Sequence, residues 1–443
     1  MSLRDVNWGP LGVASTTPHP ILAQDLISPD RRQRALDRLH TRDLHRAEDW
    51  RYTSLKSLKG LTPPLKAKDE STWSGTLNGL PIDGLQSNGV RLYRLSDLAD
   101  QSYDDLTDKA WAWINAQLNQ EEAMHDLQSL HFQDGLLVVV EADHKGGDLD
   151  LVHLVESTHL DVDINATNFW IYLGPNAALN VTERFVSQSD STLNAPQHKV
   201  VIPLSSMYLS RGSQLTYTRS QDALRGGVTS ESHLGRVTAS VFAQAQLTLT
   251  CLNLGADLCR LELDVSLEES SANADLYGLY LGSDRAELDQ HLILRHKANK
   301  CTSSQRFKGA LGARSKGVFT GRIIVSPGAS STRADQNNPN LLLSESAKAV
   351  TRPQLEIYND DVECSHGATV GQLDKDALFY LKARGLCEAD ALRALTSAFV
   401  GEIREALTSP DLKNAVDFAL RRSLGLELDV SEQGEEWIDW EAL

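Results

Sequence analysis

The sequence is poor in cysteine, in aromatic residues and in positive charge. Its 443 residues include 5 cysteines, an odd number with no Cys-x-x-Cys spacing, which argues against a disulfide framework and for a reducing compartment. Aromatic residues make up 6%, and 43 Lys and Arg stand against 60 Asp and Glu, giving a formal net charge of −17. Because this field repels phosphate groups, we expect neither nucleic acid nor a membrane surface as a partner.

The sequence also lacks the marks of a membrane protein or of the common enzyme classes. No apolar run approaches the roughly 20 residues that cross a bilayer, and the N-terminus lacks the basic head and apolar run of a secretory signal. A cytoplasmic location is therefore expected. Nucleotide-binding, zinc-protease and serine-hydrolase motifs are absent. The stretch "GALGARSKG" (309–317) only superficially resembles a phosphate loop, since Lys316 follows no glycine and precedes no Ser or Thr.

What the sequence does have is a long region of alternating apolar and polar residues, the pattern of strands with one buried face. The pattern is clearest in "QLTLTC" and "LELDVSLE". The residues predicted to point inward there are Leu247, Leu249, Cys251, Leu261, Leu263, Val265 and Leu267, and those predicted to point outward are Glu262, Asp264 and Glu268. The turn phrases between such strands resemble one another only loosely, at irregular spacing. A sandwich, a barrel and a strand solenoid all fit this pattern, and the length of the region favours a parallel β-helix.

Helical patterns flank this region on both sides. We therefore expect an N-terminal helical and irregular domain at 1–134, a β-helix core at 135–370 and a C-terminal helical domain at 371–443. Asp374 is placed to cap the first C-terminal helix, and Gly385 to end it. In the next helix Leu392, Leu395, Phe399 and Ile403 form an apolar stripe.

One pair of residues stands out as a candidate metal site. Cys364 and His366 lie two positions apart, and if the strand that contains Leu355 continues this far, both side chains project to the same side. Thiolate and imidazole are plausible ligands for iron or copper-like metals, but two ligands do not complete a site. The alternative is a small buried cysteine beside a capping histidine. The other four cysteines are predicted to be small core residues.

Two stretches resemble a known family. "RPQLEIYNDDVECSHGATVGQLDKDALFYLKARGL" (352–386) resembles the C-terminal signature of the SufB/SufD family of iron–sulfur cluster assembly proteins. "LHRAEDWRYTSLKSL" (44–58) resembles the entry segment of the SufD branch. SufB-like sequences tend to carry His-Glu-Ala where this chain has His366-Gly367-Ala368, so the resemblance points to the SufD side of the family.

The resemblance implies a scaffold and not an enzyme, since the absent phosphate loop leaves ATP to a partner. It implies pairing with SufB through the ends of the β-helices, and binding of the ATPase SufC through the C-terminal helices. Sulfur-donor proteins of the SUF system and a homodimer of the isolated chain are further expectations. A transient iron–sulfur cluster would be shared with SufB and not held by this chain alone. The residues implied are His366 and Cys364 as metal ligands, and Phe379, Tyr380 and Arg384 as SufC contacts.

Two other readings remain open at this stage. The chain could be a purely structural SufD-like subunit in which His366 is only a turn residue. It could also be a carbohydrate-active β-helix enzyme, a class that works mostly outside the cytosol with clustered carboxylates. The resemblance further implies a bacterial cytoplasm, or the plastid stroma for a plant or algal source.

Overall fold

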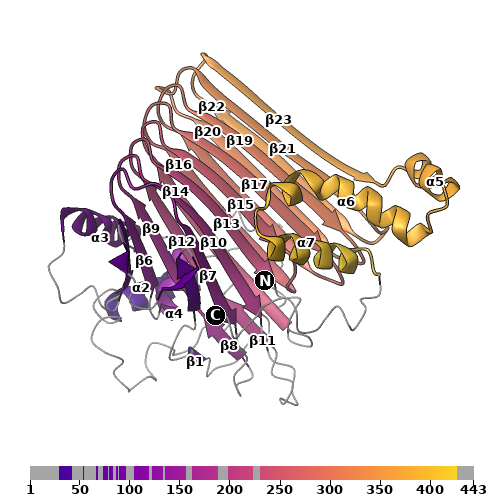
Figure 1. Cartoon of the computed structure of the whole chain (residues 1–443), viewed down its shortest axis with the longest axis horizontal. Coiled ribbons are helices and arrows are strands. Elements are labelled where there is room, and N and C mark those ends of the chain that lie inside the picture. Colours follow the sequence, from indigo (N-terminus) through magenta and orange to yellow (C-terminus); the bar gives the residue numbers. More distant parts are fainter. Residues whose placement is uncertain are drawn as a thin grey trace.

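The computed structural model describes residues 29–41, 53, 66–67, 73–77, 79–82, 86–87, 89–95, 104–118, 122–132, 135–155, 162–187, 198–222 and 230–426. Apart from Thr53, the predicted entry segment at 44–58 lies outside these residues. The middle of the chain forms two mostly parallel sheets that face each other across a shared core (Figure 1). We call them sheet A and sheet B.

The strands of sheet A, in chain order, are β1 (Lys66–Ala67), β4 (Gln86–Ser87), β5 (Val90–Arg94), β6 (Gly135–Val140), β8 (Val162–Asn165), β9 (Asn168–Leu173), β11 (His198–Val201), β12 (Leu204–Leu209), β14 (Ser230–Val241), β16 (Leu258–Leu267), β18 (Glu287–His296), β20 (Lys316–Val325) and β22 (Lys348–Ile357). The strands of sheet B are β2 (Trp73–Leu77), β3 (Leu80–Pro81), β7 (Asp148–Val155), β10 (Ala178–Ser187), β13 (Gln214–Asp222), β15 (Gln246–Asn253), β17 (Asn273–Gly282), β19 (Thr302–Leu311), β21 (Thr332–Leu342) and β23 (Val362–Gln372).

From β12 onward, consecutive strands alternate between the two sheets, and each pairs in parallel with the next strand of its own sheet. The chain therefore winds as a β-solenoid of about seven turns, and the predicted parallel β-helix is confirmed. From β16 the register is regular, because Leu258 pairs with Glu287 and Glu287 with Lys316, a repeat of about 30 residues. The sequence does not repeat visibly from turn to turn, because each turn of the solenoid needs only side chains that fill the interior and no particular residue at a given position.

The N-terminal part of the chain contributes strands as well as helices. β5 pairs antiparallel with β6, and β2 pairs antiparallel with β7, so this end of both sheets is covered by the chain itself. The helices here are α2 (Pro29–Thr41), α3 (Asp105–Leu118) and α4 (Ala123–His131). α2 packs on α4, α4 on β14 and α3 on β6. The outer face of sheet A is thus partly buried at this end.

The predicted inward positions are core residues. Leu247, Leu249 and Cys251, and likewise the inward residues of β16, are at most 1% exposed. Glu262 lies on the outer face of sheet A, as predicted, yet it is only 8% exposed. Its carboxylate pairs with Arg236 at 2.9 Å and with Arg260 at 2.8 Å. The alternation of apolar and polar residues identifies the two faces of a strand, but it does not show whether another part of the chain covers the outer face.

The C-terminal helices are α5 (Lys375–Ala383), α6 (Glu388–Ala406) and α7 (Pro410–Ser423). α6 and α7 lie across the outer face of sheet B (Figure 1), where they share an apolar cluster with β15, β17 and β19. The C-terminal residues of this cluster are Val400 and Ile403 of α6, Leu407 at its C-terminal cap, and Leu412, Ala415, Val416, Ala419 and Leu420 of α7. Only Ile403 of the predicted stripe is fully buried, since the buried face is centred on Ala391, Thr396 and Val400.

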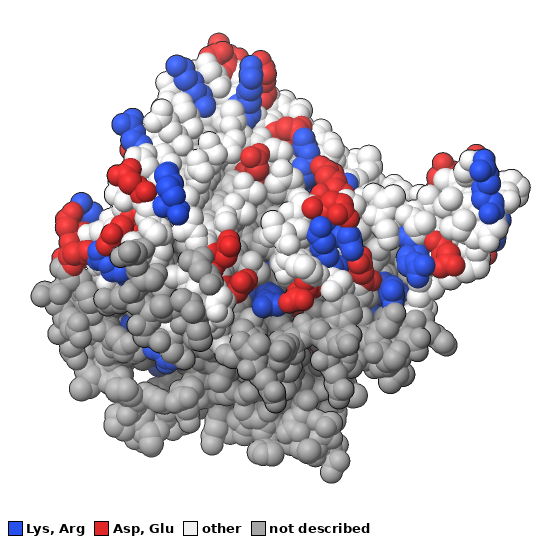
Figure 2. All heavy atoms as spheres, in the orientation of Figure 1, with Lys and Arg blue, Asp and Glu red and all other residues white. Residues whose placement is uncertain are grey.

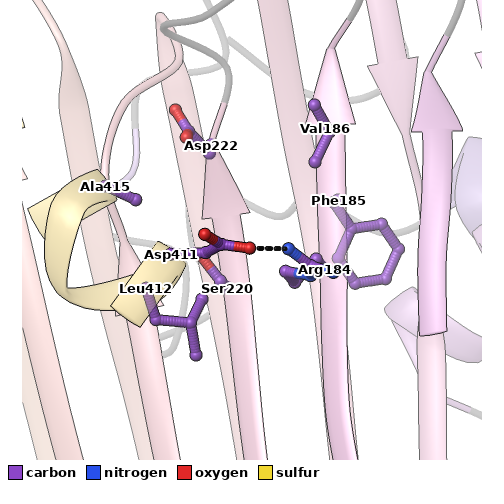
Figure 3. A pocket seen from close by; sticks show the side chains of 8 residues that line it. All are labelled: Arg184, Phe185, Val186, Ser220, Asp222, Asp411, Leu412 and Ala415. Atoms are coloured by element: carbon purple, nitrogen blue, oxygen red, sulfur yellow. Dashed lines mark hydrogen bonds and ion pairs between the residues drawn. The ribbon is translucent and has the colours of Figure 1, made fainter. Parts of the chain in front are cut away.

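Ion pairs fix the edges of this contact. Figure 3 shows Arg184 of β10 beside the start of α7, with its Nη1 atom 3.4 Å from Asp411 Oδ2. Lys308 Nζ of β19 lies 2.8 Å from Glu402 of α6. None of the helices in the described part of the chain has the length and apolar character that crossing a lipid bilayer requires.

Candidate functional site

The last turn of the solenoid ends in two strands that are each paired on one side only. β22 pairs with β20, and β23 pairs with β21; within the described residues no strand covers their other edges. In the part of the chain that the structure describes, nothing stacks on this turn, and apolar side chains are exposed on it: Ile357 by 41%, Tyr358 by 61% and Val370 by 46%. We call β22 and β23 together the terminal turn.

The chain changes sheets immediately before the candidate pair. The strand containing Leu355 ends at Ile357, and a turn follows in which Asn359 accepts from the backbone N–H of Asp361 at 2.9 Å. Cys364 therefore lies on β23 of sheet B and not on a continuation of the Leu355 strand in sheet A, which corrects that part of the prediction. β23 runs to Gln372, so Gly367 and Gly371 also lie within this strand.

Cys364 and His366 nevertheless share one face, as their spacing predicts. In the register of sheet B, Cys364 lies beside Ala334 and His366 beside Gln336, and both of these partners are buried in the solenoid core. Cys364 is partly buried and packs against the apolar cluster around Ile323 and Val325. His366 points to the same side but is exposed, because no further strand among the described residues pairs beyond β23. The pair thus stands at the open end of the core.

The environment treats the two side chains differently. Burial raises the pKa of the Cys364 thiol, an effect weakened by a backbone hydrogen bond from Ala334. The thiol is therefore protonated at neutral pH, and it would have to lose its proton to bind a metal. Neighbouring carboxylates are engaged elsewhere: Glu363 lies 3.1 Å from Arg333, and Asp361 accepts from Ser331.

The described residues do not supply the remaining ligands. Among them, no group of three or more His, Cys, Asp and Glu side chains lies close enough to hold a metal ion. The next carboxylate along the sheet, Asp335, faces outward and accepts from Ser365 and Arg306. A metal or cluster at His366 would need ligands from outside this part of the chain. The role of Cys364 and His366 as ligands stays a prediction.

The terminal turn leads directly into α5. Asp374 accepts from the backbone N–H of Asp376 at 2.9 Å and so caps this helix, and Gly385, with a φ of 97°, follows its end, as predicted. α5 buries none of its residues and projects from the body (Figures 1 and 2). Phe379 is 74% exposed and Tyr380 56%, and the Arg384 guanidinium lies 4.9 Å from the Tyr380 ring centroid.

The remaining cysteines are not part of this site. Cys251, Cys259 and Cys301 are buried, as predicted, and burial raises the pKa of Cys251 and Cys259 to about 12. The prediction for Cys387 is wrong, because this residue is exposed. Its sulfur accepts from the Asp390 backbone N–H at 3.4 Å and caps α6.

Residues 156–399 match the family model described as SUF system FeS cluster assembly, SufBD core domain. This chain belongs to the SufBD family of iron–sulfur cluster assembly proteins. The matched region contains most of the solenoid, the terminal turn, α5 and most of α6. Cys364, His366, Phe379, Tyr380 and Arg384 all lie within it, so the predicted site residues fall in the part of the chain that is common to the family.

Two SufBD relatives align with most of the chain. A SufBD family protein of Synechocystis sp. is 27% identical over 412 residues, which cover 88% of this chain and 90% of the relative. The SufD protein of Escherichia coli is 26% identical over 375 residues, which cover 83% of this chain and 86% of the relative. The SufD protein of Plasmodium falciparum is 28% identical over 247 residues, 56% of this chain and 16% of that protein. These relatives support a SufD-type protein, as the motif around His366 predicts.

Sequence reasoning missed the interior polar residues of this SufBD chain. Gln305, Gln336, Asn338 and Asn340 lie inside the last turns, each at most 4% exposed. In the sequence they stand in polar stretches that give no sign of burial. The only available signal is that they occupy the alternate positions of β19 and β21 whose side chains point into the core. Recognising those positions requires the strand bounds to be known first.

Proposed function

We propose that this chain is a SufD-like, non-catalytic scaffold subunit of an iron–sulfur cluster assembly complex. In this proposal it pairs with SufB through the terminal turn and binds the ATPase SufC through its C-terminal helices. The observation that carries the proposal is an exposed histidine, with a cysteine two residues before it, at the open end of a rigid solenoid, without further ligands among the described residues. Such a pair is suited to be one half of a site that a second protein completes.

The open edges of the terminal turn support pairing with a second solenoid. β22 is 10 residues long and β23 is 11, and long exposed strand edges are surfaces that proteins normally cover or pair. The exposed Ile357, Tyr358 and Val370 lie on the same turn and would add apolar area to the contact. A partner that docks here would bring its own ligands directly to His366.

Within this shared site, His366 is the primary ligand and Cys364 the secondary one. The imidazole is exposed and binds a metal in its neutral form, whereas the Cys364 thiol is partly buried and its pKa is raised. The iron–sulfur cluster is the cargo of this site. It is held transiently, with thiolate ligands supplied mainly by SufB, and the isolated chain holds none.

The C-terminal helices provide a separate surface for SufC. Phe379 and Tyr380 project from a helix that buries none of its own residues, and aromatic and Arg side chains are the residue types that dominate protein interfaces. Only Leu373 and Asp374 separate β23 from α5. A change in SufC that moves α5 would therefore act on the strand that carries His366.

The test is cluster assembly by a complex reconstituted with SufB and SufC. His366→Ala should abolish assembly while the complex still forms, and Thr369→Ala, a change on the outward face of the same strand, should leave both intact. Normal assembly by the His366 variant would refute the ligand role and favour the purely structural alternative, as would loss of the complex itself. ATP hydrolysis by the isolated chain would contradict the non-catalytic assignment.

A further inference from the structure

A short column of buried amide side chains ends directly beneath His366. In sheet B, Gln305 of β19 lies beside Gln336 of β21, and Gln336 lies beside His366 of β23. Neighbouring strands are about 4.8 Å apart, and residues in register point to the same face. Both glutamines are 0% exposed. The imidazole therefore stands next to a buried carboxamide at the open end of the core.

The direction of the amides is set by one hydrogen bond. Gln336 Nε2 donates to Gln305 Oε1 at 2.6 Å. In a planar carboxamide one N–H bond points opposite to the C=O bond, which is the geometry that forms amide ladders between parallel strands. In that ladder geometry, the Gln336 N–H that donates toward β19 leaves the carbonyl oxygen on the side of β23. The acceptor end of the ladder thus faces the strand that carries His366.

The two ends of this ladder are unsatisfied within the described part of the chain. Gln336 Oε1 is buried without a hydrogen-bond partner, and so is Gln305 Nε2 at the opposite end. Gln305 Nε2 faces Leu276, which is apolar and in register with Gln305 on β17. Gln336 Oε1 has an imidazole on the adjacent strand. A buried acceptor without a partner is costly, and His366 is the donor nearest to it in the register of the sheet.

The opposite sheet limits rotation of the Gln336 amide. A Cβ atom at Gly321 of β20 would lie 2.3 Å from Gln336 Nε2, so the glycine leaves the space that the amide occupies. The Phe319 ring closes the same space, at 2.8 Å from that Cβ position. The amide therefore lies against the backbone of Gly321, in a space that a Cβ at this position would fill.

We propose that Gln336 is a positioning residue that fixes the tautomer of His366. Its Oε1 atom accepts a hydrogen bond from Nδ1–H of His366, and this leaves the Nε2 lone pair free to face outward toward a metal. A histidine ligand is commonly oriented in this way by an acceptor on its other ring nitrogen. The use of this arrangement in cluster binding rests on the proposed function, whereas the tautomer itself does not.

The tautomer can be measured on the metal-free chain by two-bond ¹H–¹⁵N correlation NMR. The chain is labelled with ¹⁵N-histidine and studied at a pH of about 8.5, where imidazole is neutral, and His366→Ala assigns the signals. The native chain should show a protonated Nδ1 and an unprotonated Nε2. Gln336→Met keeps the length of the side chain but removes the acceptor, so both nitrogens should shift toward values averaged over two tautomers.

Gln305→Met is the matched control, because it makes the same change one turn deeper and leaves Gln336 Oε1 in place. It should leave the His366 signals unchanged. In the reconstituted complex, assembly should fall by about tenfold or more in the Gln336 variant and little in the Gln305 variant. If Gln336→Met fails to fold, Gln336→Glu retains an acceptor at this position and should retain the Nδ1–H tautomer.

Three outcomes would overturn the proposal: a protonated Nε2 in the native chain, unchanged signals in Gln336→Met, or equal shifts in Gln305→Met. Because this measurement involves neither SufB nor a cluster, it can fail while the His366→Ala assembly test succeeds. Conversely, a fixed Nδ1–H tautomer in a chain whose His366→Ala variant still assembles clusters would leave the positioning intact and refute only the ligand role.

Discussion

The attachment of α7 to the solenoid depends on a glycine at the end of β19. A Cβ atom at Gly312 would lie 1.7 Å from the carbonyl oxygen of Ser423, the last residue of α7. Non-bonded atoms settle at roughly 3.5 Å, so Gly312→Ala would force this end of the helix outward by about 2 Å. The neighbouring atom belongs to the backbone, and a change of rotamer cannot relieve the contact.

This displacement would weaken the packing at the end of α7. Leu420 is 2% exposed on the same turn, and Arg422 Nη2 lies 2.9 Å from Asp284 Oδ2 across the contact. Overpacking of this kind costs about 1–3 kcal/mol. Gly328→Ala is the matched control, because a Cβ there meets nothing within 4 Å. That change should be neutral or raise stability by about 0.4–1 kcal/mol through the unfolded state.

Two measurements check this prediction. Urea unfolding followed by circular dichroism should give a lower midpoint for Gly312→Ala than for the native chain, and an equal or higher midpoint for Gly328→Ala. Hydrogen exchange should show the loss of protection in α7 of the Gly312 variant. Equal midpoints for the two variants would refute the steric argument, as would a lower midpoint with unchanged protection of α7.

Three further changes test the core, the buried ion pairs and the proposed SufC surface. Burial lowers the pKa of His296 to about 4; the unfolded chain therefore takes up this proton first as the pH falls, so stability should decrease from about pH 6.5 toward pH 4. His296→Leu should reduce that slope by up to about 1.4 kcal/mol per pH unit, measured by urea unfolding at several pH values. Arg260→Ala removes the cation that pairs with buried Asp289 and leaves buried Glu262 with Arg236 alone, so it should lower the free energy of unfolding by about 3–5 kcal/mol in the same assay. Phe379→Ala should change stability by less than about 0.5 kcal/mol and weaken SufC binding by about tenfold or more in calorimetric titration.

Each of these predictions has a control or a contrary result. An unchanged pH slope in His296→Leu would show that this group does not titrate on unfolding. Lys297→Ala removes an exposed pair with Glu268 and should cost at most about 1 kcal/mol. A loss as large as that of Arg260→Ala would contradict the role of burial. SufC affinity unchanged in Phe379→Ala would place the SufC contact elsewhere.

The fold could be predicted because two local signals are strong. The alternation of apolar and polar residues identifies the inward face of each strand, and Leu261, Leu263 and Val265 are buried as that pattern requires. Caps and terminal glycines are equally local, and Asp374 and Gly385 hold the predicted places at the ends of α5. Cys364 and His366 share one face because residues two positions apart on a strand point to the same side, even though the predicted strand was the wrong one.

Other features depend on what lies beside a residue, and the sequence does not carry that information. Glu262 occupies an outward-pointing position of its strand, where an exposed residue is expected. It is buried because it pairs with Arg236 and Arg260, which in turn contact Glu122 and Thr53 of the N-terminal part of the chain. Gln305 and Gln336 are separated by one solenoid turn, and their hydrogen bond exists only because the register of the sheet is fixed.

The sequence by itself determined the class of the fold, the faces of the strands, the ends of α5 and the position of the Cys364–His366 pair, since each follows from residues close together in the chain. Only the tertiary structure decided that this pair stands on the last turn of the described solenoid, that α5 projects while α6 and α7 are docked on sheet B, and that a buried amide lies beside His366 in the register of the sheet. The physical reason is that coverage and register join residues about 30 positions apart or more, and side-chain chemistry along the chain does not specify which of them meet.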